Sequence, residues 1–74
     1  MRIVWELGPG QLSSRTLAAR CGGISPTVLH RRLSELRDVH LVDLEERRGY
    51  ALTDTGRGLL ELLVRMEAWA ASVG

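Results

Sequence analysis

The stretch Ile24-Ser25-Pro26-Thr27-Val28-Leu29-His30-Arg31-Arg32-Leu33-Ser34-Glu35-Leu36 decides the fold of this 74-residue chain. It predicts a helix over residues 24–37 with a defined start. Ser25 is a good N-cap residue, because its hydroxyl can accept a hydrogen bond from the first turn, and Pro26 falls at the first helical position, where its missing N–H costs nothing. At about 100° per residue, three leucines stack into one apolar stripe that would face a core: Leu29, Leu33 and Leu36.

The opposite face of this helix carries side chains that donate or accept hydrogen bonds, and none of them is a carboxylate: Thr27, His30, Arg31 and Ser34. A helix with an apolar stripe on one side and such a face on the other is what the major groove of DNA accepts. The alternative that this pattern leaves open is an ordinary solvated surface helix.

Positive charge gathers on the same part of the chain. The net charge of the whole chain is only +1. Residues 13–37, however, carry five arginines against one glutamate, a local charge of +4. Such clustering is an electrostatic footprint for phosphate groups.

Length and composition predict one small domain, residues 1–74. The single cysteine excludes an intramolecular disulfide. We find no signal peptide and no run of transmembrane length, so the chain is expected in a reducing cytoplasm without a membrane partner.

On the N-terminal side, Ile3, Val4 and Leu7 predict a short helix that ends at the breaker Gly8-Pro9-Gly10. Trp5 is expected to be a core or interface anchor. Gln11 and Leu12 are expected to be extended. A second helix over residues 15–21 should follow, capped by Ser13 or Ser14 and stopped at Gly22-Gly23. A helix, a glycine-containing turn and the capped helix together make a helix-turn-helix pattern.

On the C-terminal side, residues 41–53 predict two short strands around the tight turn Glu45-Glu46-Arg47-Arg48-Gly49, which is a small wing. Thr53 should cap a last helix over residues 54–73, with Asp54 near its positive end. Glu61 and Arg65 stand four residues apart and can pair on its polar side.

The last helix is too apolar for a domain of this size to cover. We therefore expect it to pack on a second copy of the chain. The alternative is that the first helix and the hairpin cover it fully. The residues expected at the dimer interface are Trp5, Leu59, Leu62, Leu63, Met66, Trp69 and Val73.

Three segments resemble the winged helix-turn-helix transcriptional regulators of bacteria, and most closely the HxlR family, with MarR and PadR regulators as relatives. Residues 23–36 resemble the recognition helix, and Leu41-Val42 resembles the strand entry. Residues 50–59, Tyr-Ala-Leu-Thr-Asp-Thr-Gly-Arg-Gly-Leu, resemble the junction between wing and last helix. The resemblance implies a mainly helical α-α-α-β-β-α fold with a small hairpin, which dimerises through the long last helix.

The resemblance also implies a homodimeric regulator, expected to be a repressor, that binds a pseudo-palindromic double-stranded DNA operator. The alternative is a winged-helix module that binds other proteins and does not bind DNA. The residues expected to contact DNA are Thr27, His30, Arg31 and Ser34 at base edges, Ser25 and Pro26 near phosphate, Arg15 and Arg37 on the backbone, and Arg47 and Arg48 on the wing.

Three departures from the family pattern carry expectations of their own. The wing is short, and its first half is acidic, with Asp43, Glu45 and Glu46. His40 stands where the family usually has a helix-ending glycine, so it is expected to adopt a left-handed conformation. Cys21 follows Leu17 by four residues and is expected to be a structural thiol in the core. The alternative is a reactive thiol whose pKa is lowered by Arg20.

Nothing in the chain predicts catalysis, because no nucleophile has a positioned base and no glycine-rich loop could cradle phosphate. Cys21, His30 and His40 do not have zinc-site spacing. We therefore expect no enzyme activity, no metal and no cofactor. The sequence assigns no small-molecule effector.

Overall fold

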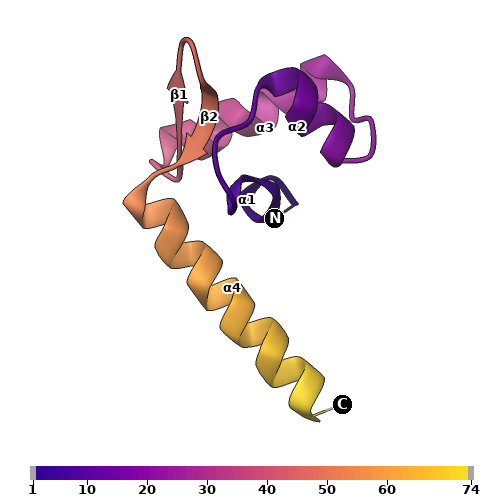
Figure 1. The fold of residues 1–74 in the computed structure, drawn as a ribbon, viewed down its shortest axis with the longest axis vertical. Helices are drawn as coiled ribbons and strands as arrows, with labels where there is room; N and C mark the ends of the chain where they lie inside the picture. Colours follow the sequence, from indigo (N-terminus) through magenta and orange to yellow (C-terminus); the bar gives the residue numbers. More distant parts are fainter. Residues whose placement is uncertain (1, 74) are drawn as a thin grey trace.

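The computed structural model describes residues 2–73. The chain forms α1 (Arg2–Leu7), α2 (Ser14–Arg20), α3 (Pro26–Asp38), β1 (Val42–Glu45), β2 (Gly49–Leu52) and α4 (Asp54–Val73). This order confirms the predicted mainly helical α-α-α-β-β-α fold with one small hairpin. Figure 1 shows α1, α2, α3 and the hairpin gathered at one end of the molecule, with α4 extending away from them.

The core lies where the apolar stripes of the first three helices meet the base of the hairpin. Its buried residues are Ile3, Val4, Leu7, Leu17, Leu29, Leu33, Val42, Tyr50 and Leu52. Each such side chain contributes about 1.5–3 kcal/mol when it is buried. This packing explains why α1 is stable, although six residues would not hold a helix in water by themselves.

Side chains cap three of the helices at their N-termini. Ser13 accepts a hydrogen bond from the backbone N–H of Thr16 at 3.2 Å, so Ser13 and not Ser14 caps α2. Ser25 accepts from the N–H of Val28 at 3.3 Å, as expected for the start of α3. Thr53 likewise caps α4, accepting at 3.0 Å from an N–H in its first turn. Each cap satisfies a backbone donor that the helix itself leaves unpaired.

Leu12 adds an isolated β-bridge to the two-stranded hairpin. The sequence predicted only an extended backbone at this residue. β1 and β2 pair antiparallel, with Val42 opposite Leu52. Leu12 also bonds to Tyr50 in both directions, N to O at 3.0 Å and O to N at 2.8 Å. Gly49 sits beside this bridge with φ +93°, and a Cβ at that position would overlap the Leu12 carbonyl. Only glycine suits this position.

The chain between α3 and β1 turns through His40, which has φ +60°. The predicted left-handed conformation is therefore confirmed. Thr53 stabilises it by donating a hydrogen bond from Oγ1 to the His40 carbonyl oxygen at 2.5 Å. The same threonine thus holds the end of one segment and caps the next helix.

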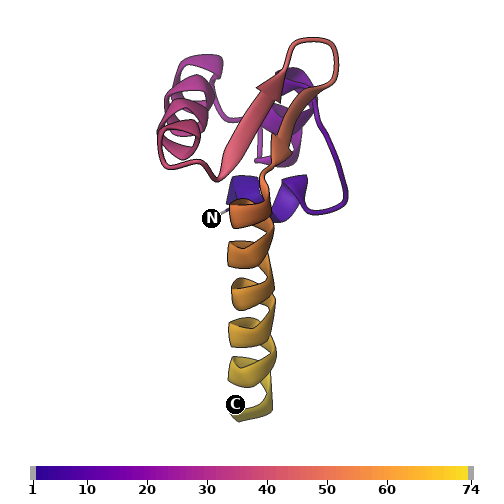
Figure 2. The ribbon, with the colours of Figure 1, turned by 90° about the vertical axis from the view of Figure 1, so that its left-hand side faces the viewer.

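The first half of α4 packs on the core, and its second half does not. Leu59, Leu60 and Leu63 are half-buried against the core, whereas every residue from 64 to 73 is exposed. Figure 2 shows the C-terminal part of this helix standing clear of the other elements. The whole molecule measures 40 × 26 × 19 Å along its principal axes. The alternative in which α1 and the hairpin cover α4 fully is therefore wrong.

Trp5 is 37% exposed, so it is not a core residue, and it lines a shallow pocket beside the second half of α4. Its expected place at an interface stays a prediction. Glu61 and Arg65 do not pair, because both are exposed and water solvates them as well as a partner would. Within residues 2–73, the one ion pair joins Arg2 and Glu6.

No helix in the described part of the chain is both long and apolar enough to cross a membrane.

Candidate nucleic-acid interface

The helix-turn-helix consists of α2, the turn at Gly22-Gly23 and α3. Cys21 ends α2, and its backbone N–H donates to the Leu17 carbonyl at 3.0 Å. The chain then reverses through the two glycines, which both have positive φ, and enters α3 at its serine cap. Figure 1 shows α2 and α3 lying next to each other at the same end of the molecule.

The outer face of α3 is free to contact a partner. Leu29 and Leu33 are each 1% exposed and fix which side of the helix faces the core. The four polar residues predicted on the opposite side are all exposed: Thr27, His30, Arg31 and Ser34. We call this set the reading face. Its exposure agrees with the helical periodicity, and its contact with DNA stays a prediction.

The N-terminus of α3 offers a second set of donors. Pro26 has no N–H, and the N–H of Val28 bonds to Ser25. Thr27, between them, has a backbone N–H for which the helix provides no acceptor. The first turn of α3 also has no acidic residue. Since helix N-termini carry partial positive charge, the N–H groups of this turn can donate hydrogen bonds to a phosphate oxygen.

The exposed arginines of α2 and α3 are not neutralised by ion pairs. Arg15, Arg31, Arg32 and Arg37 are all exposed, and none has a carboxylate within 4.0 Å among residues 2–73. Unpaired guanidinium groups at this density attract phosphate and release counterions when they bind it.

The wing gives weaker electrostatic support. Arg47 and Arg48 lie exposed at the tip of the hairpin, as predicted. However, Asp43, Glu45 and Glu46 are exposed on the same hairpin, so three carboxylates oppose two guanidinium groups. The electrostatics therefore favour α2 and α3, rather than the wing, as the main surface for DNA.

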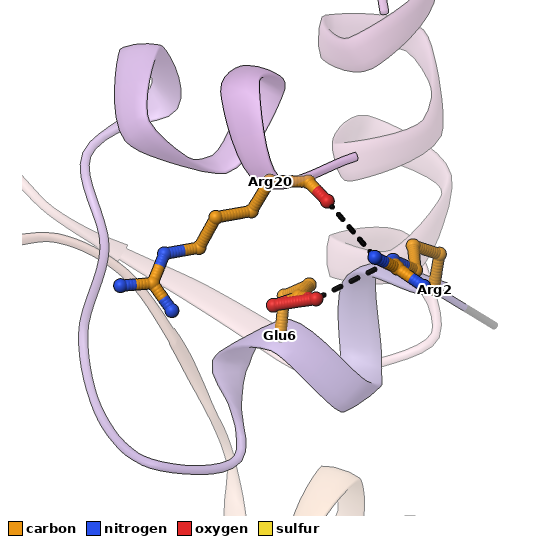
Figure 3. A network of polar contacts seen from close by, with 3 residues as sticks. All are labelled: Arg2, Glu6 and Arg20. Carbon is orange, nitrogen blue, oxygen red and sulfur yellow. Dashed lines mark hydrogen bonds and ion pairs between the residues drawn. The ribbon is translucent and has the colours of Figure 1, made fainter. Parts of the chain in front are cut away.

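A contact that sequence reasoning missed holds the helix-turn-helix against α1. Arg2 donates from Nη2 to the backbone carbonyl of Arg20 at 3.2 Å, and its Nε lies 3.4 Å from Glu6 Oε1 (Figure 3). The Arg20 side chain itself points away from Arg2 (Figure 3). The spacing of Arg2 and Glu6 could have indicated their pairing. The acceptor on Arg20 is a backbone oxygen, which every residue has, so no residue type in the sequence could have indicated the bond to it.

A second missed contact joins α4 to the end of α1. Arg57 donates from Nη1 to the Gly8 carbonyl oxygen at 3.4 Å. α1 is therefore tied to both neighbouring helices through backbone carbonyls.

Cys21 is half-buried and packs against the core. Burial raises the pKa of its thiol, and the nearby Glu6 carboxylate adds to this effect, while Arg2 partly opposes it. The direction of this shift is opposite to the one that a reactive thiol beside Arg20 would need. Within residues 2–73, no group of three or more His, Cys, Asp or Glu side chains could hold a metal ion.

Comparisons with known proteins agree with this geometry. A family model described as HxlR-like helix-turn-helix matches residues 1–74. The crystal structure of the quinone-bound YodB from B. subtilis is similar, with a TM-score of 0.86 and 28% sequence identity over 95% of this chain and 78% of the YodB chain. Among curated proteins, none matches this sequence. The chain has a winged helix-turn-helix fold and belongs to the HxlR-like helix-turn-helix family, whose members are DNA-binding transcription regulators and not enzymes.

Proposed function

We propose that this protein is a homodimeric repressor that binds a specific double-stranded DNA operator. The observation that carries the proposal is the reading face, whose four side chains are all exposed and include no carboxylate. It is backed by two leucines that fix its direction. A side-chain set of this kind suits the edges of base pairs in the major groove.

In the proposed complex, α3 enters the major groove. Arg31 contacts a base or a phosphate, and the other residues of the reading face lie at base edges. The first turn of α3, from Ser25 to Thr27, approaches a phosphate. Arg15 and Arg37 contact the DNA backbone, and Arg47 and Arg48 are the contacts from the wing.

Exposed apolar residues on α4 support dimerisation. Four of them recur at spacings of four, three and four: Leu62, Met66, Trp69 and Val73, which are 56%, 64%, 69% and 63% exposed. We call these four residues the α4 stripe. Such a repeat is typical of a seam between two packed helices. Leu59 and Leu63, which we also expected at the interface, already pack on the core of their own chain, and Trp5 borders the same helix.

A symmetric dimer would place two copies of α3 about one helical turn of DNA apart, on a pseudo-palindromic site. Occupying such a site near a promoter blocks transcription without any additional contact surface. Repression is therefore the simplest outcome of the proposed binding.

YodB is described in a quinone-bound state. For this chain we propose no covalent effector, because Cys21 is its single cysteine and the raised pKa of that thiol disfavours the nucleophilic thiolate. Its role in the proposal is to pack against the core.

A protein-binding module without DNA affinity is the second candidate. The acidic half of the wing and the exposed α4 stripe favour it. The unpaired arginines around α3 argue against it, since such a module would not need them.

The test begins with selection of operators from a randomised duplex library, followed by titration of the best duplex at several salt concentrations. The proposed repressor binds this duplex more tightly than random duplex, and its affinity falls steeply as salt rises. Sedimentation of the same sample reports a dimer. Absence of duplex binding at low salt by a well-folded dimer would favour the protein-binding module.

A further inference from the structure

An open pocket of about 630 Å³ lies on the flank of α3, away from the reading face. α1 contributes Arg2 and Ile3 to it, and Ile24 comes from the segment before α3. α3 contributes Arg32 and Leu36. Cys21, at the end of α2, and the segment after α3 also border the pocket. The proposed DNA contacts use none of the residues that line it.

The apolar part of the lining is incompletely covered by the protein itself. Three apolar residues of the lining pack on the core but remain only half-buried: Ile24, Leu36 and Leu41. Val39, which also lines the pocket, is 60% exposed. An apolar ligand body placed here would remove this surface from water, which is the usual driving force for binding in such pockets.

The charged part of the lining favours a negative head group. Two arginines, Arg2 and Arg32, oppose one glutamate, Glu35, so the lining has a net charge of +1. Arg2 is already held by Glu6 and by the Arg20 carbonyl. Arg32, in contrast, has no hydrogen-bond acceptor or ion-pair partner among residues 2–73. Its guanidinium group is available to a ligand.

We propose that this pocket is a binding site for a small amphipathic monoanion, in which one carboxylate is joined to an apolar body. The carboxylate pairs with Arg32, for which guanidinium geometry is well suited. The apolar body lies against Ile24, Leu36 and Val39. Glu35 disfavours a dianion, and the two arginines disfavour a cation.

The neighbouring arginines Arg31 and Arg32 make this site separable from the DNA surface. They stand about 100° apart around α3, so Arg31 belongs to the reading face while Arg32 lines the pocket. Binding at the pocket does not require DNA, and it can therefore be measured whether or not the protein recognises an operator.

The experiment titrates the full chain with 2-naphthoate and, in parallel, with the neutral 2-naphthamide, which has the same ring system. Calorimetry gives the affinity, and backbone amide NMR shifts locate the site. We expect 2-naphthoate to bind more tightly than 2-naphthamide, with the largest shifts at Ile24, Leu36 and Val39.

Three variants sharpen the assignment. Arg32→Gln should weaken 2-naphthoate binding by roughly three- to tenfold, the loss expected for one charge-assisted pair in a half-open site. Val39→Glu should abolish it by placing a second carboxylate in the pocket. Arg31→Gln, which removes the same charge one residue away, should leave 2-naphthoate affinity unchanged while it weakens duplex binding.

Three results would overturn the proposal. One is equal binding of 2-naphthoate and 2-naphthamide, and another is equal loss of affinity in Arg31→Gln and Arg32→Gln. The third is a set of NMR shifts confined to the α4 stripe, which would place the ring system on that exposed apolar surface instead. Loss of duplex binding alone, with 2-naphthoate binding intact, would count against the repressor and not against the pocket.

Discussion

Arg2 and Arg20 meet through a backbone atom: the guanidinium group of Arg2 lies 3.2 Å from the carbonyl oxygen of Arg20 and donates a hydrogen bond to it. This carbonyl belongs to the last turn of α2, where the helix itself leaves carbonyl groups unpaired. Arg2 of α1 thereby supplies the hydrogen-bond donor that this carbonyl oxygen lacks within α2.

The variant Arg2→Ala should lower the free energy of unfolding by about 0.5–1 kcal/mol, because it removes this bond and the ion pair to Glu6. The loss is small because the Arg2 side chain is 68% exposed and water replaces its partners. Thermal denaturation measures the change. Arg20→Ala is the matched control, since it keeps the carbonyl and should be close to neutral. Equal destabilisation by both variants would contradict this role for Arg2.

Two glycines of α4 should respond to alanine with opposite signs. A Cβ at Gly56 would overlap the Leu41 carbonyl, so Gly56→Ala should cost about 1–3 kcal/mol through forced backbone movement. A Cβ at Gly58 meets nothing within 4 Å, so Gly58→Ala should stabilise the helix by about 0.5–1 kcal/mol. Chemical denaturation of the two variants decides the matter, and changes of the same sign would refute the close contact at Gly56.

Arg31→Ala should weaken binding to the selected operator by about 1–3 kcal/mol and relax specificity at one base pair if the guanidinium reads a guanine. The effect follows from its exposure on the reading face. Fluorescence anisotropy against the operator and its single-base variants provides the measurement. An operator affinity that stays unchanged would remove Arg31 from the proposed contacts.

Met66→Lys should convert the proposed dimer into a monomer, because it places a charge in the middle of the α4 stripe, where two copies would exclude water. Sedimentation at several protein concentrations reports the change. Glu61→Lys introduces the same residue on the same helix but off the stripe, and it should leave the dimer intact. If wild-type protein sediments as a monomer, the assignment of the stripe fails.

The thiol of Cys21 predicts a loss of stability at alkaline pH. Burial raises the pKa of this group in the folded chain, so the folded state holds the proton more tightly than the unfolded state does. The stabilising contribution is complete below the thiol's ordinary pKa and is lost as pH rises through the raised value. Denaturation of wild-type and Cys21→Ala protein over this range should show a steeper alkaline decline for wild type. Identical slopes would contradict the raised pKa.

Local signals in the sequence accounted for most of the fold. Pro26 after Ser25 marked the start of α3, and the leucine spacing identified its buried side, because both effects act within a few residues. The left-handed backbone at His40 was predicted from the family resemblance instead, because His40 stands where a helix-ending glycine is usual.

Contacts between distant segments were not predictable in the same way. The pairing of Leu12 with Tyr50 uses backbone atoms that every residue has, so no residue type signals it. Helical periodicity alone predicted the reading face. It could not predict the pocket beside Arg32, because that pocket depends on where α1 lies relative to α3.

The pairing of Leu12 with Tyr50 also bears on how the wing can diverge among related proteins. It anchors the base of the hairpin to the segment before α2, whereas the turn residues 46–48 are exposed and lie beyond the last paired residues, Glu45 and Gly49. Insertions or deletions at an exposed tip disturb little of a fold. The length of the wing can therefore change during evolution while the orientation of α3 relative to the core stays the same.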